Sequence, residues 1–220
     1  MAVKYADGVV LGADSRTSTG TYVANRASDK ITRICDNVWM CRSGSAADTQ
    51  NVAAYVSRLA EEHAVSVSSA AAGAEERLTC DVKLVANLTK TIAYENKERL
   101  QAGMIIAGWD RKLGPQVYGI PLGGALVEAP FTVGGSGSAY VYGWCDDTFK
   151  EDMSRDKAET WVTRAISLAI ARDASSGGVI RLVTIDGNGC ERRMIQPIEQ
   201  PPCDDELPQI KRAADVEMTT

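Results

Sequence analysis

The chain has few of the residues from which most catalytic sites are built. It contains a single histidine, His63, which lies among charged residues near the end of an expected helix, where nothing supports a Ser-His-Asp triad. It has no cluster of metal-ligating residues and no phosphate loop carrying a lysine. We therefore expect no metal and no cofactor, so any chemistry must come from carboxylates, basic side chains and backbone groups.

Other absences limit the class of protein and the compartment. No apolar run approaches the roughly 20 residues of a membrane span, and residues 1–5 lack the long apolar stretch of a secretory signal. The net charge of −5 argues against nucleic acid as a partner, because nucleic-acid-binding domains usually carry a basic patch. The six cysteines include no C-x-x-C pair and no secretory signal is present, so we expect reduced thiols in a cytosolic protein. From the apolar runs and the net charge we expect neither a membrane nor a nucleic acid as a partner.

The overall composition is ordinary for a globular protein. Hydrophobic residues make up 45% of the 220 residues and charged residues 24%. One compact domain is the expectation at this length, and we place it at residues 1–196. After Pro197 the sequence is rich in proline and acidic residues, so residues 197–220 are expected to form an extended or disordered tail.

Hydrophobic periodicity predicts blocks of strands and helices rather than strict alternation. Strands are expected at residues 1–5, 9–13, 37–41, 104–108, 116–120, 125–133, 179–185 and 190–195. Helices are expected after Ser45, from about residue 84 to before Gly103, at 138–145 and at 154–171. Residues 15–28 are polar and are expected to form a long loop. Such blocks favour an α+β fold with antiparallel sheets.

Two features indicate how the helices begin and pack. Ser45 and Asp48 fit a capping box at the start of the first helix, and Ser154 is expected to cap the last one. Helical spacing predicts that four apolar residues share the buried face of the first helix: Val52, Tyr55, Val56 and Leu59.

Acidic and basic side chains gather near the ends of the first strands. Asp14 directly follows the buried strand at 9–13, and Arg16 and Lys30 supply cations nearby in the sequence. A buried lysine beside a carboxylate can control the proton balance of a nucleophile. The alternative is an ordinary ion pair that braces a loop, because such networks also shift pKa values without being catalytic.

Three glycine-containing segments could complete such a site. In residues 42–45 a helix start offers backbone N–H groups to an anion, Gly44 allows close approach and Arg42 adds a positive charge. A plain strand-to-helix turn is the alternative. Residues 134–138 match neither G-x-S-x-G nor a Walker loop and indicate a glycine-rich turn before a helix. Residues 173–178 could bring Asp173 and Ser176 to Asp14, or could be a simple helix stop.

These segments, in this order, resemble a β-type subunit of the 20S proteasome over nearly the whole chain, from Met1 to about Arg193. The matching segments are residues 2–5, 8–16, 29–30, 41–48, 105–110, 134–138 and 172–178. The resemblance implies a four-layer αββα sandwich, with two antiparallel sheets between helix layers, which is the fold of the N-terminal nucleophile hydrolases. It also implies a threonine-type endopeptidase.

The resemblance assigns catalytic roles to individual residues. Lys30, braced by Asp14, would lower the barrier electrostatically, and the backbone N–H of Gly44 would stabilise the oxyanion. The remaining catalytic residues would hold the nucleophile's amine and the attacking water: Asp173, Ser136 and Ser176.

The resemblance also implies a substrate preference and partners. Arg42 would line the S1 pocket and select acidic P1 residues, as in the β1-type, caspase-like subunits, because a cation there rejects lysine and arginine. Thr17, Thr19 and Ala46 would also bind the substrate. The implied partners are other α and β proteasome subunits in a stacked-ring cylinder and protein or peptide substrates, degraded with ATP-dependent regulators in the cytoplasm and nucleus.

One element of the family pattern is missing from this sequence. In active members the Ala-Val strand follows Thr-Thr-Ile, and the first threonine is the nucleophile, with its own α-amine as the base. This sequence begins at Met1, after the place of that tripeptide, and Thr17, Thr19, Thr219 and Thr220 have no free α-amine. We favour a record truncated at an internal methionine, because the other catalytic elements are intact. An inactive ring member and, more weakly, a free-standing amidohydrolase of the same fold are the alternatives.

Overall fold

The computed structural model describes residues 1–68 and 78–202. Its strands are β1 (Ala2–Tyr5), β2 (Gly8–Ala13), β3 (Thr17–Thr19), β4 (Tyr22–Asn25), β5 (Ile31–Cys35), β6 (Val38–Gly44), β7 (Ala102–Asp110), β8 (Gly114–Ile120), β9 (Val127–Glu128), β10 (Phe131–Thr132), β11 (Ile180–Asp186) and β12 (Gly189–Ile195). Its helices are α1 (Ala46–Ser68), α2 (Val82–Glu95), α3 (Ser138–Thr148) and α4 (Arg155–Arg172), followed by the short 3₁₀ helix η1 (Pro197–Glu199).

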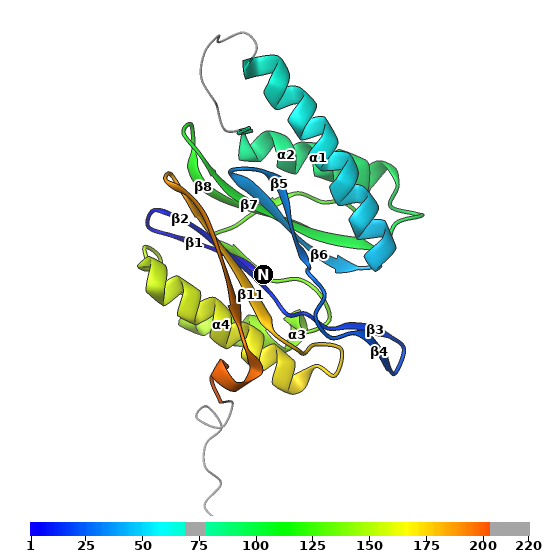
Figure 1. Cartoon of the computed structure of the whole chain (residues 1–220), viewed down its shortest axis with the longest axis vertical. Helices are drawn as coiled ribbons and strands as arrows, with labels where there is room; N and C mark the ends of the chain where they lie inside the picture. Colours follow the sequence, from blue (N-terminus) through cyan, green and yellow to red (C-terminus); the bar gives the residue numbers. More distant parts are fainter. Residues whose placement is uncertain (69–77, 203–220) are drawn as a thin grey trace, which may run out of the picture.

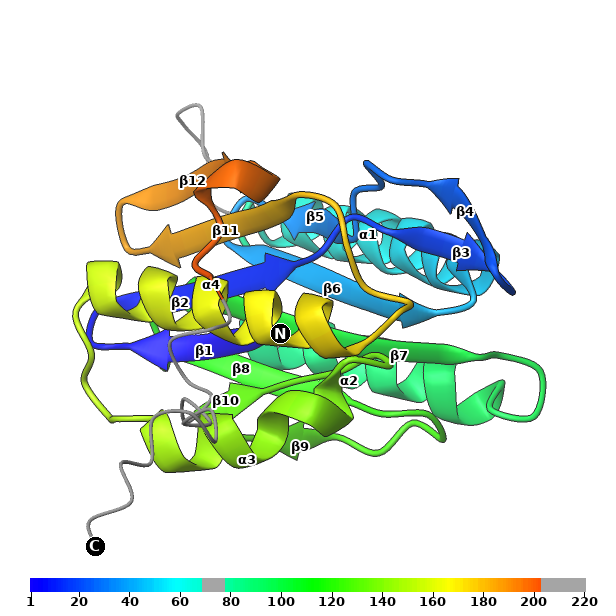
Figure 2. The same ribbon diagram turned by 90° about the horizontal axis from the view of Figure 1, so that it is seen from below.

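Two antiparallel five-stranded sheets lie face to face, and a pair of helices covers the outer side of each (Figures 1 and 2). One sheet has the order β10-β1-β2-β11-β12 and packs against α3 and α4. The other has the order β5-β6-β7-β8-β9 and packs against α1 and α2. The predicted αββα sandwich, with its α+β class, is confirmed.

Three clusters of buried side chains hold the four layers together. Side chains of neighbouring residues in a strand point to opposite faces of the sheet. Val10 of β2 therefore joins the cluster beneath α4, whereas Leu11 joins the cluster between the sheets. In the same way Met40 of β6 packs beneath α1 and α2, whereas Cys41 faces the other sheet. This explains why the strands at the centre of the fold are apolar on both faces.

Gly12 lets α4 lie close against β2. A Cβ atom built at Gly12 would be 2.3 Å from Cγ1 of Val162 and 2.7 Å from Cδ1 of Ile166. A larger residue would push the helix away, because packed interiors leave little free volume. The contact holds the middle of α4 against the end of β2, directly before Asp14.

Several expected strands differ from the observed ones. Residues 15–28 are not one long loop, because β3 and β4 form a two-stranded hairpin within them. The strand β5 at Ile31–Cys35 was missed altogether. The single strand expected at 125–133 is two short strands, β9 and β10, which belong to different sheets. Pro130 lies between them and cannot donate a ladder hydrogen bond, so the chain leaves one sheet there and enters the other.

The predicted helices are present, but their faces and caps need correction. Tyr55 is 66% exposed, so the apolar buried face of α1 is instead formed by Val52, Val56 and three alanines, Ala53, Ala60 and Ala64. The small alanines let the helix lie close to the sheet. A prediction based on large apolar residues at helical spacing does not identify them.

Caps were predicted only in part. Ser45 Oγ accepts the backbone N–H of Asp48 at 3.3 Å, as a capping box requires, but Oδ2 of Asp48 accepts the backbone N–H of Gln101 instead of returning to Ser45. Ser154 occupies the N-cap position of α4 without a side-chain cap hydrogen bond.

The C-terminal region is only partly described. Residues 197–199 form η1, so the expected extended tail does not begin directly at Pro197. Residues 203–220, which hold most of that tail, lie outside the described residues. None of the helices within the described ranges combines the length and apolar character needed to cross a bilayer.

Asp110, at the end of β7, is a buried carboxylate that joins α2 to the β7–β8 turn. Its Oδ2 accepts the backbone N–H of Val82, at the start of α2, at 3.1 Å and Nε2 of Gln116 at 2.6 Å. Its Oδ1 accepts the backbone N–H groups of Lys112 and Leu113 at 3.0 and 2.8 Å. Burial alone would raise the pKa of Asp110, but the four hydrogen bonds outweigh it and lower the pKa below its ordinary value.

We expect Asp110→Asn to lower the free energy of unfolding at neutral pH by about 1–3 kcal/mol, because the amide turns a donor toward N–H groups. The folded-state pKa of Asp110 is depressed, so its stabilisation is complete above the unfolded value near 3.8 and is lost as the pH falls through the folded value. Urea unfolding at neutral pH and at steps below about pH 4 measures both effects.

Asp147→Asn, on the exposed side of α3, is the matched control and should behave like the unchanged protein. Parallel stability curves for the Asp110→Asn variant and the unchanged protein across the acid range would contradict the assignment.

Candidate active site

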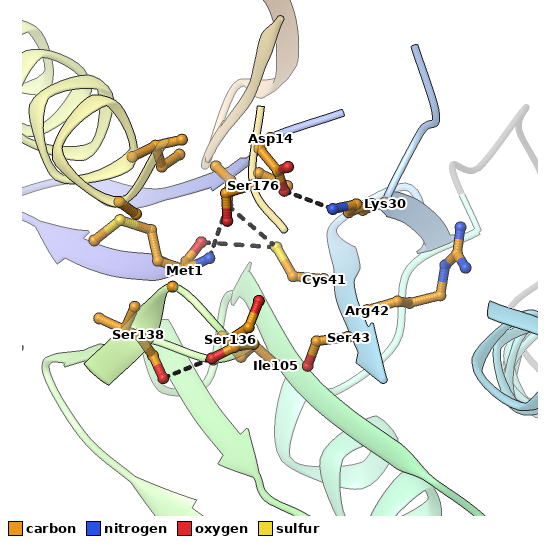
Figure 3. Close-up of a pocket in the computed structure, with 18 of the residues that line it drawn as sticks. Met1, Asp14, Lys30, Cys41, Arg42, Ser43, Ile105, Ser136, Ser138 and Ser176 are labelled. Atoms are coloured by element: carbon orange, nitrogen blue, oxygen red, sulfur yellow. Dashed lines mark hydrogen bonds and ion pairs between the residues drawn. The ribbon is translucent and has the colours of Figure 1, made fainter. Parts of the chain in front are cut away.

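A cavity of about 240 Å³ opens where the ends of β2 and β6 meet the loops before α3 and after α4 (Figure 3). Many separate segments line it, from Met1 to Ser176, so no single motif defines the site. The predicted site residues that line it are Asp14, Lys30, Arg42, Gly44, Ala46, Ser136 and Ser176.

Asp14 and Lys30 form an ion pair at the cavity wall. Nζ of Lys30 donates to Oδ1 of Asp14 at 2.6 Å, and the two side chains are 25% and 14% exposed. The other oxygen of Asp14, Oδ2, accepts the backbone N–H groups of Arg16 at 3.1 Å and Gly177 at 3.0 Å. The carboxylate is therefore fixed from three sides and holds the ammonium group of Lys30 in the cavity.

A second carboxylate, that of Asp173, lies behind the part of the cavity wall that Ser136 and Ser176 form. Oδ2 of Asp173 accepts the hydroxyl groups of Ser136 at 2.7 Å and Ser176 at 2.6 Å, and its Oδ1 accepts the backbone N–H of Ser175. Burial would raise the pKa of Asp173, but the hydrogen bonds from Ser176 and Ser136 and the charge of Lys30 lower it below its ordinary range. Asp173 thus stays ionised and orients both hydroxyl groups.

The 173–178 loop joins these two groups of residues. Gly177 donates to Asp14, while Ser176 donates to Asp173 within the same loop. The loop therefore places Ser176 at the same cavity as Asp14 and contacts both carboxylates.

Arg42 occupies a separate part of the cavity and points away from the Asp14–Lys30 pair (Figure 3). Its guanidinium donates to Oγ1 of Thr32 at 2.9 Å, to Oγ1 of Thr49 at 3.4 Å and to the backbone oxygen of Asp29 at 2.7 Å. Burial lowers the pKa of Arg42 and the nearby Asp29 opposes this effect, but a guanidinium remains protonated at any physiological pH.

The partners of Arg42 leave its charge available to a ligand. Within residues 1–68 and 78–202 the three oxygens that accept hydrogen bonds from Arg42 are all neutral. The carboxylate of Asp29 is paired instead with Arg192, at 2.7 Å. A bound anion could therefore take the positive charge of Arg42 as its counter-charge.

Gly44 ends β6 in a conformation that favours glycine. Its φ is +100°, and a Cβ atom there would lie 2.3 Å from the backbone oxygen of Gln101. The backbone can therefore turn into α1 immediately beside the cavity, and Ala46, in the first turn of α1, also lines it.

Thr17 and Thr19 do not line the described cavity. They lie in β3, on the hairpin that projects from the body of the molecule in Figure 1. Oγ1 of Thr17 instead shares a hydrogen bond of 2.6 Å with Oγ of Ser28. Of the predicted substrate contacts, Arg42 and Ala46 line the cavity, whereas these two threonines lie outside it.

Some residues of the site were not singled out from the sequence. Met1 lines the cavity, and its amino nitrogen donates to the backbone oxygen of Gly12 at 2.7 Å. Thr32 and Thr49 hold Arg42, and the backbone of Gly177 holds Asp14. Threonines and backbone groups carry no sequence signal of such a role, because their function depends on contacts between distant segments.

The αββα sandwich with this cavity at the ends of β2 and β6 is consistent with the N-terminal nucleophile hydrolase fold of proteasome subunits. The family model described as "Proteasome subunit" matches residues 1–185. A "Proteasome subunit beta type-6" from Arabidopsis thaliana is 53% identical over 192 residues, which are 87% of this chain and 78% of that protein. A "Proteasome subunit beta type-1" from Saccharomyces cerevisiae is 45% identical over 199 residues, 90% of this chain and 88% of that protein. The chain therefore belongs to the proteasome beta-type subunit family.

Proposed function

We propose that this chain is a β1-type subunit of the 20S proteasome core that hydrolyses peptide bonds after acidic residues. The observation that carries the proposal is Arg42, a charged guanidinium at the cavity whose described acceptors are neutral. An acidic P1 side chain gains a charge-assisted hydrogen bond there, whereas a basic one meets a like charge. The relatives bear both beta type-1 and beta type-6 names, so the subtype rests on this residue.

In this proposal the nucleophile is the first threonine of a Thr-Thr-Ile segment that precedes Met1. The position of Met1 at the cavity supports it, because residues joined to its nitrogen would be close to Lys30 and Ser136. The threonine hydroxyl attacks the peptide carbonyl, and its α-amine takes the proton, directly or through water.

The other residues of the site have supporting roles in the proposed reaction. The ammonium group of Lys30, held by Asp14, stabilises the developing negative charge, and the backbone N–H of Gly44 binds the oxyanion. Ser136 and Ser176, oriented by Asp173, hold the α-amine and the hydrolytic water. Ala46, beside Gly44, contacts the substrate near Arg42, and Thr17 and Thr19 contact it farther along its length, outside the cavity.

The proposed setting is a stacked-ring cylinder of α and β proteasome subunits. The names of the relatives describe proteasome subunits, and assembly with such partners would confine protein substrates near the cavity. We propose that the particle works with ATP-dependent regulators in the cytoplasm and nucleus.

Assembled particles purified from cells test the proposed nucleophile. Mass spectrometry of the intact subunit should identify a mature N-terminus at a threonine three residues before Met1, and a threonine-directed covalent inhibitor should label that residue. A mature N-terminus at Met1, together with an unlabelled subunit, would rule out the active role and leave a non-catalytic member of the ring.

A further inference from the structure

Two cysteines lie in contact on the far side of the sheet from the proposed active site. Sγ of Cys35 and Sγ of Cys80 are 2.7 Å apart, although 45 residues separate them in the sequence. Cys35 ends β5, and Cys80 directly precedes the N-cap of α2. Both belong to the core between α1, α2 and the sheet β5–β9, with exposures of 1% and 5%.

Backbone contacts hold the two cysteines together. The side chain of Asn37, two residues after Cys35, accepts the backbone N–H of Cys80 at 3.0 Å and donates to its backbone oxygen at 2.8 Å. It also donates to the backbone oxygen of Trp109 in β7, at 2.8 Å. The backbone N–H of Asp36 donates to the backbone oxygen of Leu78 at 3.1 Å. The approach of the sulfurs is therefore set by the positions of the two chain segments.

We propose that Cys35 and Cys80 form a redox modification site, in which a peroxide converts the two thiols into a disulfide and an external thiol restores them. A disulfide bond is about 2.05 Å long, so the sulfurs need to move only ~0.7 Å closer. In the resting protein both cysteines are thiols, as expected from the sequence for all six cysteines. Under oxidation these two form a disulfide.

The proposed reaction balances with hydrogen peroxide as the oxidant. Cys80 loses its proton, and the thiolate attacks one peroxide oxygen, which breaks the O–O bond and gives a sulfenic acid and hydroxide. The sulfur of Cys35, losing its proton to that hydroxide, then attacks Sγ of Cys80 and displaces a second hydroxide, which takes up the first proton. Two thiols and one peroxide thus give one disulfide and two waters.

The hydrogen-bond directions favour Cys80 as the residue that reacts first, because Sγ of Cys80 donates to the backbone oxygen of Ala60 at 3.3 Å and Cys35 is then the donor in the sulfur–sulfur contact. A hydrogen bond from Cys35 lowers the pKa of Cys80, and the same bond, together with burial, raises the pKa of Cys35. Cys35 is then the resolving thiol, already in place when the sulfenic acid forms.

The cross-link would act on stability rather than on chemistry. It ties the start of α2 to the end of β5 and closes a loop of 45 residues, which removes freedom from the unfolded chain. Neither cysteine lines the active-site cavity. We therefore expect a higher Tm for the oxidised subunit without a change in peptide specificity.

Peptide mapping of assembled particles tests the proposal. Particles are treated with hydrogen peroxide, free thiols are blocked with N-ethylmaleimide, and the subunit is digested with trypsin without reduction. Residues 34–42 and 78–83 are single tryptic peptides, so the disulfide should appear as a linked pair that dithiothreitol separates. Because the first peptide also holds Cys41, fragment ions must assign the link to Cys35.

Two variants distinguish the effect of a Cys35–Cys80 disulfide from the effect of oxidation at other residues. Cys35→Ser should abolish the linked peptides and the rise in Tm, whereas Cys190→Ser, at an exposed cysteine, should leave both unchanged. If Cys35→Ser fails to assemble, peptide mapping of the unchanged protein still shows whether the Cys35–Cys80 disulfide forms. Maleimide on both Cys35 and Cys80 after peroxide treatment, or sulfinic acid on Cys80 with Cys35 free, would overturn the proposal.

Discussion

Lys30→Ala is expected to lower peptide hydrolysis by assembled particles by about 10²- to 10³-fold, the size of effect seen when one donor to a developing oxyanion is removed. The side chain of Lys30 is three-quarters buried and its ammonium group is fixed by Asp14 at 2.6 Å. Its removal takes away the positive charge beside the proposed nucleophile. It also leaves the carboxylate of Asp14 without its cationic partner, which raises the cost of further negative charge nearby.

The loss should fall mainly on kcat, because the proposed charge interaction is strongest in the transition state. Initial rates on fluorogenic peptides, together with the rate of labelling by a threonine-directed inhibitor, measure it. Lys112→Ala is the matched control: Lys112 pairs with Asp81 at 2.7 Å but is 73% exposed, so its loss should leave activity unchanged. Full activity in the Lys30→Ala variant would remove Lys30 from the proposed mechanism.

The pairing of Asp14 with Lys30 could be anticipated from the sequence, but its function could not. An acid directly after a buried strand and a lysine nearby are equally consistent with a braced loop. The sequence raised the possibility that Asp173 and Ser176 come close to Asp14, but it did not show that Ser136 shares the carboxylate of Asp173 with Ser176 at the same cavity. That arrangement requires α4 and the 173–178 loop to pack beside β2, although most of the sequence separates them from β2. The roles proposed for these residues come from the resemblance to β-type proteasome subunits, because the local patterns alone left a braced loop as the alternative.

The errors in the predicted fold have a common physical origin. β3, β4 and β5 are short strands with mixed polarity, and their pairing is decided by neighbours rather than by their own periodicity. The exposed Tyr55 of α1 was predicted to be buried because aromatic residues at helical spacing usually face the core. Long apolar strands and the strongly periodic α4 were predicted well, since burial on both faces or along one stripe leaves a clear pattern.

Arg42→Ala should reduce kcat/KM for peptides with glutamate at P1 by about 10- to 150-fold, which corresponds to the 1.5–3 kcal/mol of a hydrogen bond to a charged group. Peptides with leucine at P1 should be cleaved at a similar rate or faster, because the cavity becomes less polar. The three hydrogen bonds lost within the protein are part-buried or exposed, so water can replace the guanidinium as donor and the loss of stability should be smaller than the loss of this selectivity.

Arg42→Lys separates charge from geometry in the same assay. A lysine keeps the positive charge but cannot bridge Thr32, Thr49 and the backbone oxygen of Asp29 with one planar group. It should therefore retain part of the preference for glutamate, with a value between those of the unchanged protein and Arg42→Ala. An equal loss of activity on glutamate and leucine peptides would contradict the pocket assignment, because a purely structural role for Arg42 would affect all substrates alike. A selective loss on glutamate with unchanged Tm would identify the charge of Arg42 as the origin of the specificity.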